Sequence, residues 1–313
     1  MRGRDRLCQA LLLLALLASL SSPAWARDCI GVVPAGGDAF WQQVESGALQ
    51  AGEELGVDIY YRGPQREGGV AVQLQVLERA VARGCKALVV APTGKEVGER
   101  VSQLRASGIP TIYMDRDLAG GAALGLVATD NFAAGLRAGQ HMVELLNGQG
   151  LVALLRLRRG VNSTDERERG FRQAAESGGL QLVIDTYVGD DSQLAMQALK
   201  PQLAQLDGLF TPNSNSSRAA LAAMRRLGKA GQLVHIGFDG DEVLLEALRL
   251  GDLQALLIQQ PQVIGYQAVK LAHQALRAGL SPAPVHMALE ARLITRANMA
   301  ELHEGLLEAP RKP

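Results

Sequence analysis

From Cys29 onward, short runs of apolar residues alternate with longer segments in which apolar residues recur every three to four positions. The short runs predict buried β-strands, and the longer segments predict amphipathic α-helices. Continuous apolar runs such as Ala87-Leu88-Val89-Val90 are typical of strands that helices cover on both faces. The alternation therefore predicts an α/β fold assembled from βαβ units around parallel sheets.

The first half of the chain shows this alternation clearly, and two of its helices end at a glycine. The predicted strands are Cys29–Pro34, Asp58–Arg62, Lys86–Ala91, Pro110–Asp115 and Leu126–Ala128, and the predicted helices are Phe40–Leu55, Val70–Arg83 and Val97–Ser107.

The same alternation then starts again, which predicts two similar parallel-sheet α/β lobes. The predicted helices of the second half are Ala133–Leu146, Glu166–Ser177, Ser192–Leu206, Ser216–Leu227, Asp241–Leu250 and Val263–Ala278; the predicted strands are Leu151–Leu157, Gln181–Tyr187, Gly208–Thr211, Leu233–Phe238, Leu253–Ile258 and a last extended stretch, Val285–Thr295.

The N-terminus has the pattern of a secretory signal peptide. Three arginines precede the apolar run Leu11–Leu20, which the small-x-small triplet Ala24-Trp25-Ala26 follows. The run is shorter than the roughly 20 residues that span a bilayer. We therefore expect residues 1–26 to be removed on export, so that the mature chain enters an oxidising compartment. There its two cysteines, Cys29 and Cys85, are either joined in a disulfide or buried as free thiols.

Composition and motifs exclude several classes of function. The 32 basic and 32 acidic residues give no net charge, which disfavours a nucleic-acid partner. The glycine-rich motifs that bind dinucleotides and nucleoside triphosphates are absent, as is the Gly-x-Ser-x-Gly motif of serine hydrolases. No His-x-x-x-His or Cys-x-x-Cys spacing occurs. We therefore expect a binding protein without metal or cofactor rather than an enzyme.

Polar and aromatic residues follow several predicted strands directly, where open parallel sheets bind their ligands. Aromatic rings beside carboxylates and guanidinium groups are suited to a sugar, because C–H faces stack on the rings while hydroxyls accept and donate hydrogen bonds. Taken alone, Phe40-Trp41 is more often core, and Asp115-Arg116 is more often a surface ion pair. The candidate residues at strand ends are Gly36, Gly37, Asp38, Phe40, Trp41, Pro92, Thr93, Asp115, Arg116, Asn213 and Asp239.

The order of these residues resembles the ribose-binding protein family of bacterial periplasmic binding proteins, whose fold lac-repressor-type regulators share. The resemblance extends from about Cys29 to Thr295. Its most specific pieces are Ala91-Pro92-Thr93, Asp115-Arg116, Ala128-Thr129-Asp130-Asn131, the spacing Arg167-x-x-Gly170-Phe171, and Gly237-Phe238-Asp239-Gly240.

The resemblance implies two lobes that three crossing strands join and that close on a sugar. The implied crossings are near Thr129–Asn131, Gln259–Gln260 and Val285–Ala288. The lobes would then comprise residues 27–129 plus 260–285 and residues 130–259 plus 286–313. In the family's strand order, two-one-three-four-five, the strands that begin with the two cysteines are neighbours, so a disulfide is geometrically feasible.

The resemblance also implies a set of ligand-binding residues. Two aromatic residues would stack on the sugar ring, with an aspartate before them where the family usually has asparagine, and charged and amide groups would bind the hydroxyls; Tyr187 is a further candidate aromatic. The set is Asp38, Phe40 and Trp41, then Asp115 and Arg116 from the first lobe, Arg167, Asn213 and Asp239 from the second, and Gln259 at the hinge. Pro34 and Ala91 depart from the family pattern, which disfavours ribose itself.

The implied function is capture of a neutral monosaccharide or related polyol in the periplasm. The protein would act as a monomer and deliver the ligand to the membrane permease of an ABC-type importer. The alternative is a periplasmic sensing subunit that presents its ligand to a membrane receptor kinase.

Overall fold

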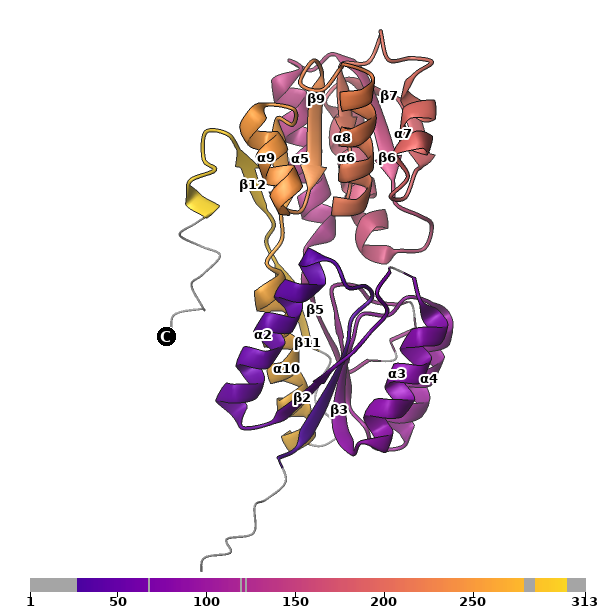
Figure 1. Cartoon of the computed structure of the whole chain (residues 1–313), viewed down its shortest axis with the longest axis vertical. Coiled ribbons are helices and arrows are strands. Elements are labelled where there is room, and N and C mark those ends of the chain that lie inside the picture. The colour runs from indigo at the N-terminus through magenta and orange to yellow at the C-terminus, as the bar shows by residue number, and fades with distance from the viewer. Residues whose placement is uncertain (1–26, 67, 119, 122, 279–284, 303–313) are drawn as a thin grey trace, which may run out of the picture.

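The computed structural model describes residues 27–66, 68–118, 120–121, 123–278 and 285–302. The predicted signal peptide, residues 1–26, and the predicted end of the second lobe, residues 303–313, lie outside this part of the chain. Two six-stranded sheets with helices on their faces form two lobes, one above the other (Figure 1). The predicted α/β class and the two-lobe architecture are confirmed.

The first sheet has the strand order β11-β5-β4-β3-β1-β2, and all its strand pairs are parallel. Helices α2 and α10 cover one face, with α3 and α4 on the other. The elements are β1 (Cys29–Val33), α2 (Ala39–Leu55), β2 (Asp58–Tyr61), α3 (Val70–Ala82), β3 (Cys85–Val90), α4 (Lys95–Ala106), β4 (Thr111–Met114), β5 (Gly125–Thr129), α10 (Pro261–Ala278) and β11 (Val285–Leu289).

The second sheet has the order β12-β10-β9-β8-β6-β7 and is parallel except for β12, which pairs antiparallel with β10. Helices α5 and α6 cover one face, and α7, α8 and α9 lie on the other. The elements are α5 (Asn131–Leu145), β6 (Gly150–Arg156), α6 (Asn162–Ser177), β7 (Leu180–Tyr187), α7 (Ser192–Leu199), β8 (Gly208–Phe210), α8 (Ser214–Arg226), β9 (Val234–Phe238), α9 (Glu242–Leu250), β10 (Ala255–Ile258) and β12 (Arg292–Thr295).

The chain crosses between the lobes three times, and the predicted third crossing is wrong. The first two crossings, at Thr129–Asn131 and Gln259–Gln260, lie where predicted. The predicted third, Val285–Ala288, instead belongs to β11, which pairs with β5 along its whole length. The chain crosses after Leu289, so the predicted lobe boundary between residues 285 and 286 is also wrong.

Two predicted helices differ from the observed ones by four residues or more at one end. The helix predicted over Ser192–Leu206 ends at Leu199, because Pro201 lacks the N–H that a continuing helix needs. The helix predicted to start at Glu166 starts four residues earlier, at Asn162. The earlier start matters for function, because it brings the first turn of α6 to the cleft between the lobes.

Helices α5 and α6 pack with their backbones in direct contact at glycines. A Cβ atom added to Gly135 would lie 1.9 Å from the carbonyl oxygen of Arg167, and one added to Gly170 would lie 2.2 Å from that of Phe132. Only glycine fits at either position. This contact fixes the placement of α6 and of the arginine on its second turn.

The structure joins Cys29 and Cys85 by a disulfide. The two residues are direct partners in the pairing of β1 with β3, and their Cα atoms lie 4.2 Å apart. The register shifts by one residue immediately after this pair, so the bridge is at the one position where the two strand starts face each other.

We expect the mature, unreduced protein to contain no free thiol, even when unfolded. The bridge closes a loop with a sequence separation of 56, for which the chain-entropy relation gives about 4 kcal/mol of stabilisation. Thiol titration in denaturant checks the bridge, and urea unfolding with and without reductant checks its contribution. Two titratable thiols would contradict the bridge.

None of the described helices is both long and apolar enough to cross a membrane.

Candidate functional site

A cleft between the lobes is lined by all nine residues that the sequence predicts for the ligand site. It contains about 380 Å³ of empty space, including its opening to solvent. The lining residues are Asp38, Phe40, Trp41, Asp115, Arg116, Leu157, Ser163, Thr164, Arg167, Asn213, Ser214, Asn215, Asp239 and Gln259.

Asp115 and Asp239 occupy equivalent places in the two lobes. Each follows a central strand and has a positive φ, 65° and 70° respectively, a conformation that aspartate tolerates better than most residues. Their backbone N–H groups donate to the carbonyls of Val127 and Leu257 on the next strand, both at 2.8 Å. The turn ends the strand and directs each carboxylate into the cleft, so the lobes present matching acceptors to a ligand between them.

Asp115 is paired with Arg116 in the first lobe. Nε of Arg116 donates to Oδ2 of Asp115 at 2.8 Å, and both side chains are buried. The guanidinium carbon of Arg116 also lies 5.8 Å from the ring centroid of Trp41. The ion pair is therefore part of the cleft wall rather than of the surface.

Gln259 connects the hinge to the binding groups of the second lobe. Its Oε1 accepts from Oγ1 of Thr129 and from Nη2 of Arg167, both at 2.7 Å, while its Nε2 donates to Oδ1 of Asp239 at 2.7 Å. Thr129 and Gln259 belong to two different crossings. The hinge and the cleft are thus joined by one buried hydrogen-bonded network.

Arg167 is held from three sides. Its Nε donates to Asn131 Oδ1 at 2.8 Å and its Nη1 to the carbonyl of Pro212 at 2.9 Å, in addition to the bond to Gln259. Its guanidinium also lies 3.9 Å from the ring centroid of Phe238. Three of its five N–H groups are engaged in these bonds, so up to two remain for a ligand.

Phe40 and Trp41 form an aromatic corner at the start of α2. Their rings are nearly perpendicular, at 88°, with centroids 4.9 Å apart. Asp38 caps the helix, since its Oδ1 accepts from the backbone N–H of Phe40 at 3.2 Å. Trp41 is only 3% exposed, whereas Phe40 is half-buried. Phe40 therefore offers the more accessible aromatic surface in the cleft.

The sequence reasoning missed the first turns of α6 and α8. Ser163 and Thr164 line the cleft from α6, and Ser214 and Asn215 line it from α8. Asn213, which was predicted, caps α8 by accepting from the backbone N–H of Ser216 at 3.1 Å. Runs of Ser, Thr and Asn directly after a strand are a signal for helix starts, and that signal was available.

Tyr187 does not line the cleft. It ends β7 at the edge of the second sheet, where the guanidinium of Arg156 lies 4.1 Å from its ring centroid. The suggestion that Tyr187 supplies a second-lobe aromatic to the site is therefore wrong. Leu157 is the apolar residue that the second lobe contributes.

One glutamine forms hydrogen bonds with both positions that depart from the family pattern, Pro34 and Ala91. Gln73, fully buried on α3, donates from Nε2 to the carbonyls of Pro34 at 2.8 Å and Ala91 at 2.7 Å. Its Oε1 accepts from the backbone N–H of Thr93 at 3.1 Å and from its hydroxyl at 2.8 Å. This satisfied amide ties the loops after β1 and β3 together behind the cleft.

Burial and charge pairing shift the pKa values of Asp239 and Arg167 in opposite directions. Burial raises the pKa of Asp239, although Arg167 and the bonds from Gln259 and Ser214 lower it in part. Burial likewise lowers the pKa of Arg167, which Asp239 and Asp115 partly restore. The cleft as a whole is lined by three aspartates and two arginines, which leaves it close to neutral. In the described part of the chain, no group of His, Cys, Asp or Glu residues is placed to hold a metal ion.

Glu168, next to Arg167 in sequence, does not line the cleft and is fully buried. Its Oε2 accepts from Nε of Arg156 at 2.6 Å, whereas its Oε1 has no hydrogen-bond partner. Burial outweighs this ion pair and raises the pKa of Glu168 to about 7. A proton on Glu168 therefore stabilises the folded state near neutral pH.

We expect the contribution of Glu168 to stability to fall as the pH rises from about 4.5 to 7. Over this range Glu168 is protonated when folded and ionised when unfolded, so its contribution falls by roughly 3 kcal/mol. His235 acts in the opposite direction, because burial lowers its pKa to about 3 and only the unfolded state binds that proton at pH 5 to 6. The Glu168 effect is therefore the difference in slope between wild type and Glu168→Gln in urea unfolding at pH 5 to 8. Glu176→Gln, on an exposed position of the same helix, should keep the wild-type slope; equal slopes for wild type and Glu168→Gln would contradict the assignment.

Comparison with known proteins shows the family to which the chain belongs. Residues 30–280 match the family described as periplasmic binding protein domain. The ribose import binding protein RbsB of Haemophilus influenzae is 28% identical over 264 residues, which cover 83% of this chain and 89% of that protein.

Several solved structures have the same fold as this chain. The periplasmic component of an ABC-type sugar transport system from Hahella chejuensis is 36% identical, with a TM-score of 0.79, and covers 85% of this chain and 99% of its own. A solute-binding protein from Agrobacterium vitis with bound D-fucose is 27% identical, with a TM-score of 0.82, over 90% of this chain and 100% of its own. The chain therefore belongs to the periplasmic binding protein family, and its predicted resemblance to the ribose-binding proteins is confirmed.

Proposed function

We propose that this chain is a periplasmic solute-binding protein that captures a neutral monosaccharide or related polyol between its lobes and delivers it to an ABC-type importer. It acts as a monomer and carries out no catalysis. The relatives compared above are an import binding protein and a component of a sugar transport system, which favours import over presentation of a ligand to a receptor kinase.

The observation that carries the proposal is the convergence of all nine predicted residues on one cleft. Two acidic turns, two guanidinium groups and an aromatic corner face it from the two lobes. Carboxylates accept from paired hydroxyls, guanidinium groups donate to ring and hydroxyl oxygens, and aromatic faces pack on C–H groups. Three acids, Asp38, Asp115 and Asp239, face two arginines in the cleft, so the cleft is close to neutral with a slight excess of negative charge, which favours an uncharged ligand over an anion.

A thermal-shift screen followed by calorimetry tests the ligand class. Pentoses, hexoses and inositols form one arm, and amino acids, sugar phosphates and carboxylates form the other. A neutral sugar or polyol should raise the unfolding temperature in proportion to its affinity. Tight binding of an anion or an amino acid, with no response to any neutral sugar, would contradict the proposal.

We also expect the ligand to shift the protein toward a closed form. Asn162 of α6 already donates to Asp117 across the cleft, and a ligand adds further contacts to both lobes. Small-angle scattering should show a smaller radius of gyration, or a narrower conformational distribution, with the sugar identified above than without it. A profile that the ligand leaves unchanged would count against closure.

A further inference from the structure

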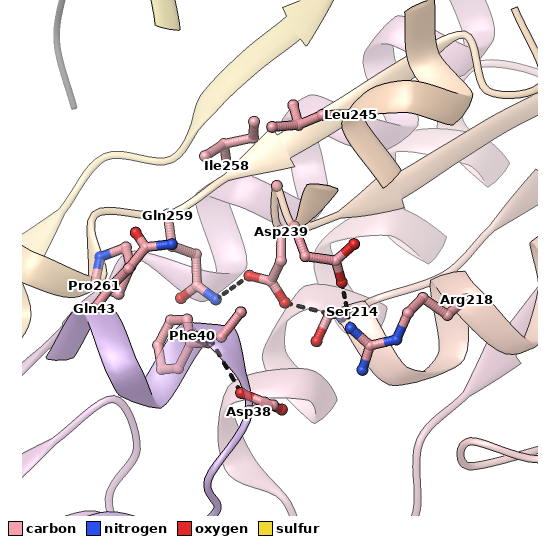
Figure 2. Close-up of a pocket in the computed structure, with 13 residues that line it drawn as sticks. Asp38, Phe40, Gln43, Ser214, Arg218, Asp239, Leu245, Ile258, Gln259 and Pro261 are labelled. Atoms are coloured by element: carbon pink, nitrogen blue, oxygen red, sulfur yellow. Dashed lines mark hydrogen bonds and ion pairs between the residues drawn. The ribbon is translucent and has the colours of Figure 1, made fainter. Parts of the chain in front are cut away.

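A second compartment adjoins the cleft, and nothing above assigns it a role. It contains about 500 Å³ of empty space, including its opening, and residues from both lobes line it. Figure 2 shows it from the side, with Phe40 of α2 facing the groups of the second lobe. The lining residues are Asp38, Ala39, Phe40, Gln43, Ser214, Arg218, Asp239, Gly240, Asp241, Leu245, Ile258, Gln259 and Pro261.

The two compartments are adjacent and share a wall. Five residues line both: Asp38, Phe40, Ser214, Asp239 and Gln259. Within this wall Asp239 accepts hydrogen bonds from Gln259 and from the backbone N–H of Ser214. A substituent on a ring that Asp239 binds therefore lies next to the second compartment.

The shared Phe40 offers aromatic surface to each side. Trp41, its perpendicular neighbour, lines the first compartment but not the second. Leu245, Ile258 and Pro261 also line the second compartment. A ring in this compartment is therefore surrounded by aromatic and aliphatic side chains as well as polar ones.

Polar groups also line the second compartment. Arg218 donates to Asp241 and, at 2.7 Å, to Oδ1 of Asn215, which leaves up to three of its five N–H groups for a ligand. Asp241 is fixed in place because its Oδ1 accepts from the backbone N–H of Leu244 at 3.0 Å and caps α9. Gln43 adds an amide from the first lobe. Asp38 and Asp239 line the compartment as well, so acids outnumber arginines and the compartment disfavours an anionic ligand.

We propose that the second compartment binds a second neutral sugar ring, so that the site, which holds a monosaccharide as its first ring, binds a disaccharide or a glycoside more tightly than the free monosaccharide. Apolar side chains together with an oriented guanidinium–carboxylate pair are the same chemistry that the first compartment offers to a sugar. This inference rests on the proposed function, because it extends the same site from one ring to two.

Calorimetry with paired sugars tests the proposal. The probes are glucose, galactose and ribose against maltose, cellobiose, lactose, melibiose, trehalose and sucrose. At least one disaccharide should bind about tenfold or more tightly than any of the monosaccharides, as expected when a ring gains a hydrogen bond to a charged group. Monosaccharide binding without such a gain would overturn the inference and leave the proposed function intact; binding of no neutral sugar would contradict both.

Two variants test whether the second compartment causes the tighter binding of the disaccharide. Arg218→Met removes the guanidinium, and Ala39→Phe fills the compartment from an exposed position that does not line the first one. Each should abolish the disaccharide preference while changing monosaccharide affinity by less than about threefold. The matched control is Arg225→Met, on the same helix and paired with Asp252 at 2.7 Å, which should keep the preference. Equal losses for both sugar classes in Arg218→Met would place the second ring elsewhere.

Discussion

Replacing Asp239 by alanine is expected to weaken sugar binding by about tenfold to a hundredfold or more. Each hydrogen bond to a charged group contributes roughly 1.5 to 3 kcal/mol. Asp239 Oδ1 and Oδ2 each accept one bond from the protein, from Gln259 and from the backbone N–H of Ser214, and each oxygen has a further lone pair for a ligand hydroxyl. Calorimetric titration with the best sugar of the screen measures the loss.

The control for this change is Arg225→Ala. Arg225 lies on α8 and is paired with Asp252, and it lines neither compartment of the cleft. Its loss should leave affinity within about twofold, in line with other exposed ion pairs. Arg167→Ala should weaken binding as Asp239→Ala does, since it removes the remaining donors and releases Gln259. Wild-type affinity in Asp239→Ala would show that the assigned site is wrong.

Replacing Gly135 by alanine is expected to destabilise the protein by about 3 kcal/mol or more. The added methyl group would meet the backbone of Arg167, and a backbone cannot rotate away as a side chain can. Helices α5 and α6 would have to separate, which moves the arginine that binds Asn131, Pro212 and Gln259. Urea unfolding measures the stability, and calorimetry on the folded variant measures the accompanying loss of affinity.

The matched control is Gly98→Ala in α4. There the added methyl group would meet Cδ1 of Leu118 at 2.9 Å, the far end of a flexible side chain. Alanine also has a helix propensity about 1 kcal/mol better than that of glycine. Stability should therefore be unchanged or slightly higher. Equal midpoints for Gly135→Ala and wild type would mean that the two helices can move apart without cost.

The alternation of apolar runs sufficed to predict nearly every element of both lobes. Burial of strands on both faces imposes continuous apolar stretches, and these are visible without tertiary information. The third crossing was not predictable in this way, since Val285–Leu289 and Arg292–Thr295 form one extended stretch in sequence. Only the pairing of β11 with β5 and of β12 with β10 divides it between two sheets.

The candidate site was predicted where its residues follow strands and was missed where they begin helices. Asp115 and Asp239 stand directly after apolar runs, whereas the charged stretch around Arg167 obscured the start of α6 at Asn162. Arg218 and Asp241 lie 23 positions apart in sequence and carry no motif. Their association depends on the packing of α8 against α9, which no local pattern encodes.

The route of the chain through the hinge has a consequence for biosynthesis. Helix α10 packs against α2 through Gly47 and Gly265, and β11 completes the sheet at β5, yet both are made after every element of the second lobe except β12. A nascent chain that stops before Pro261 leaves the α2 face of the first sheet without its covering helix. The first lobe can therefore complete its packing only after nearly all of the chain has been synthesised.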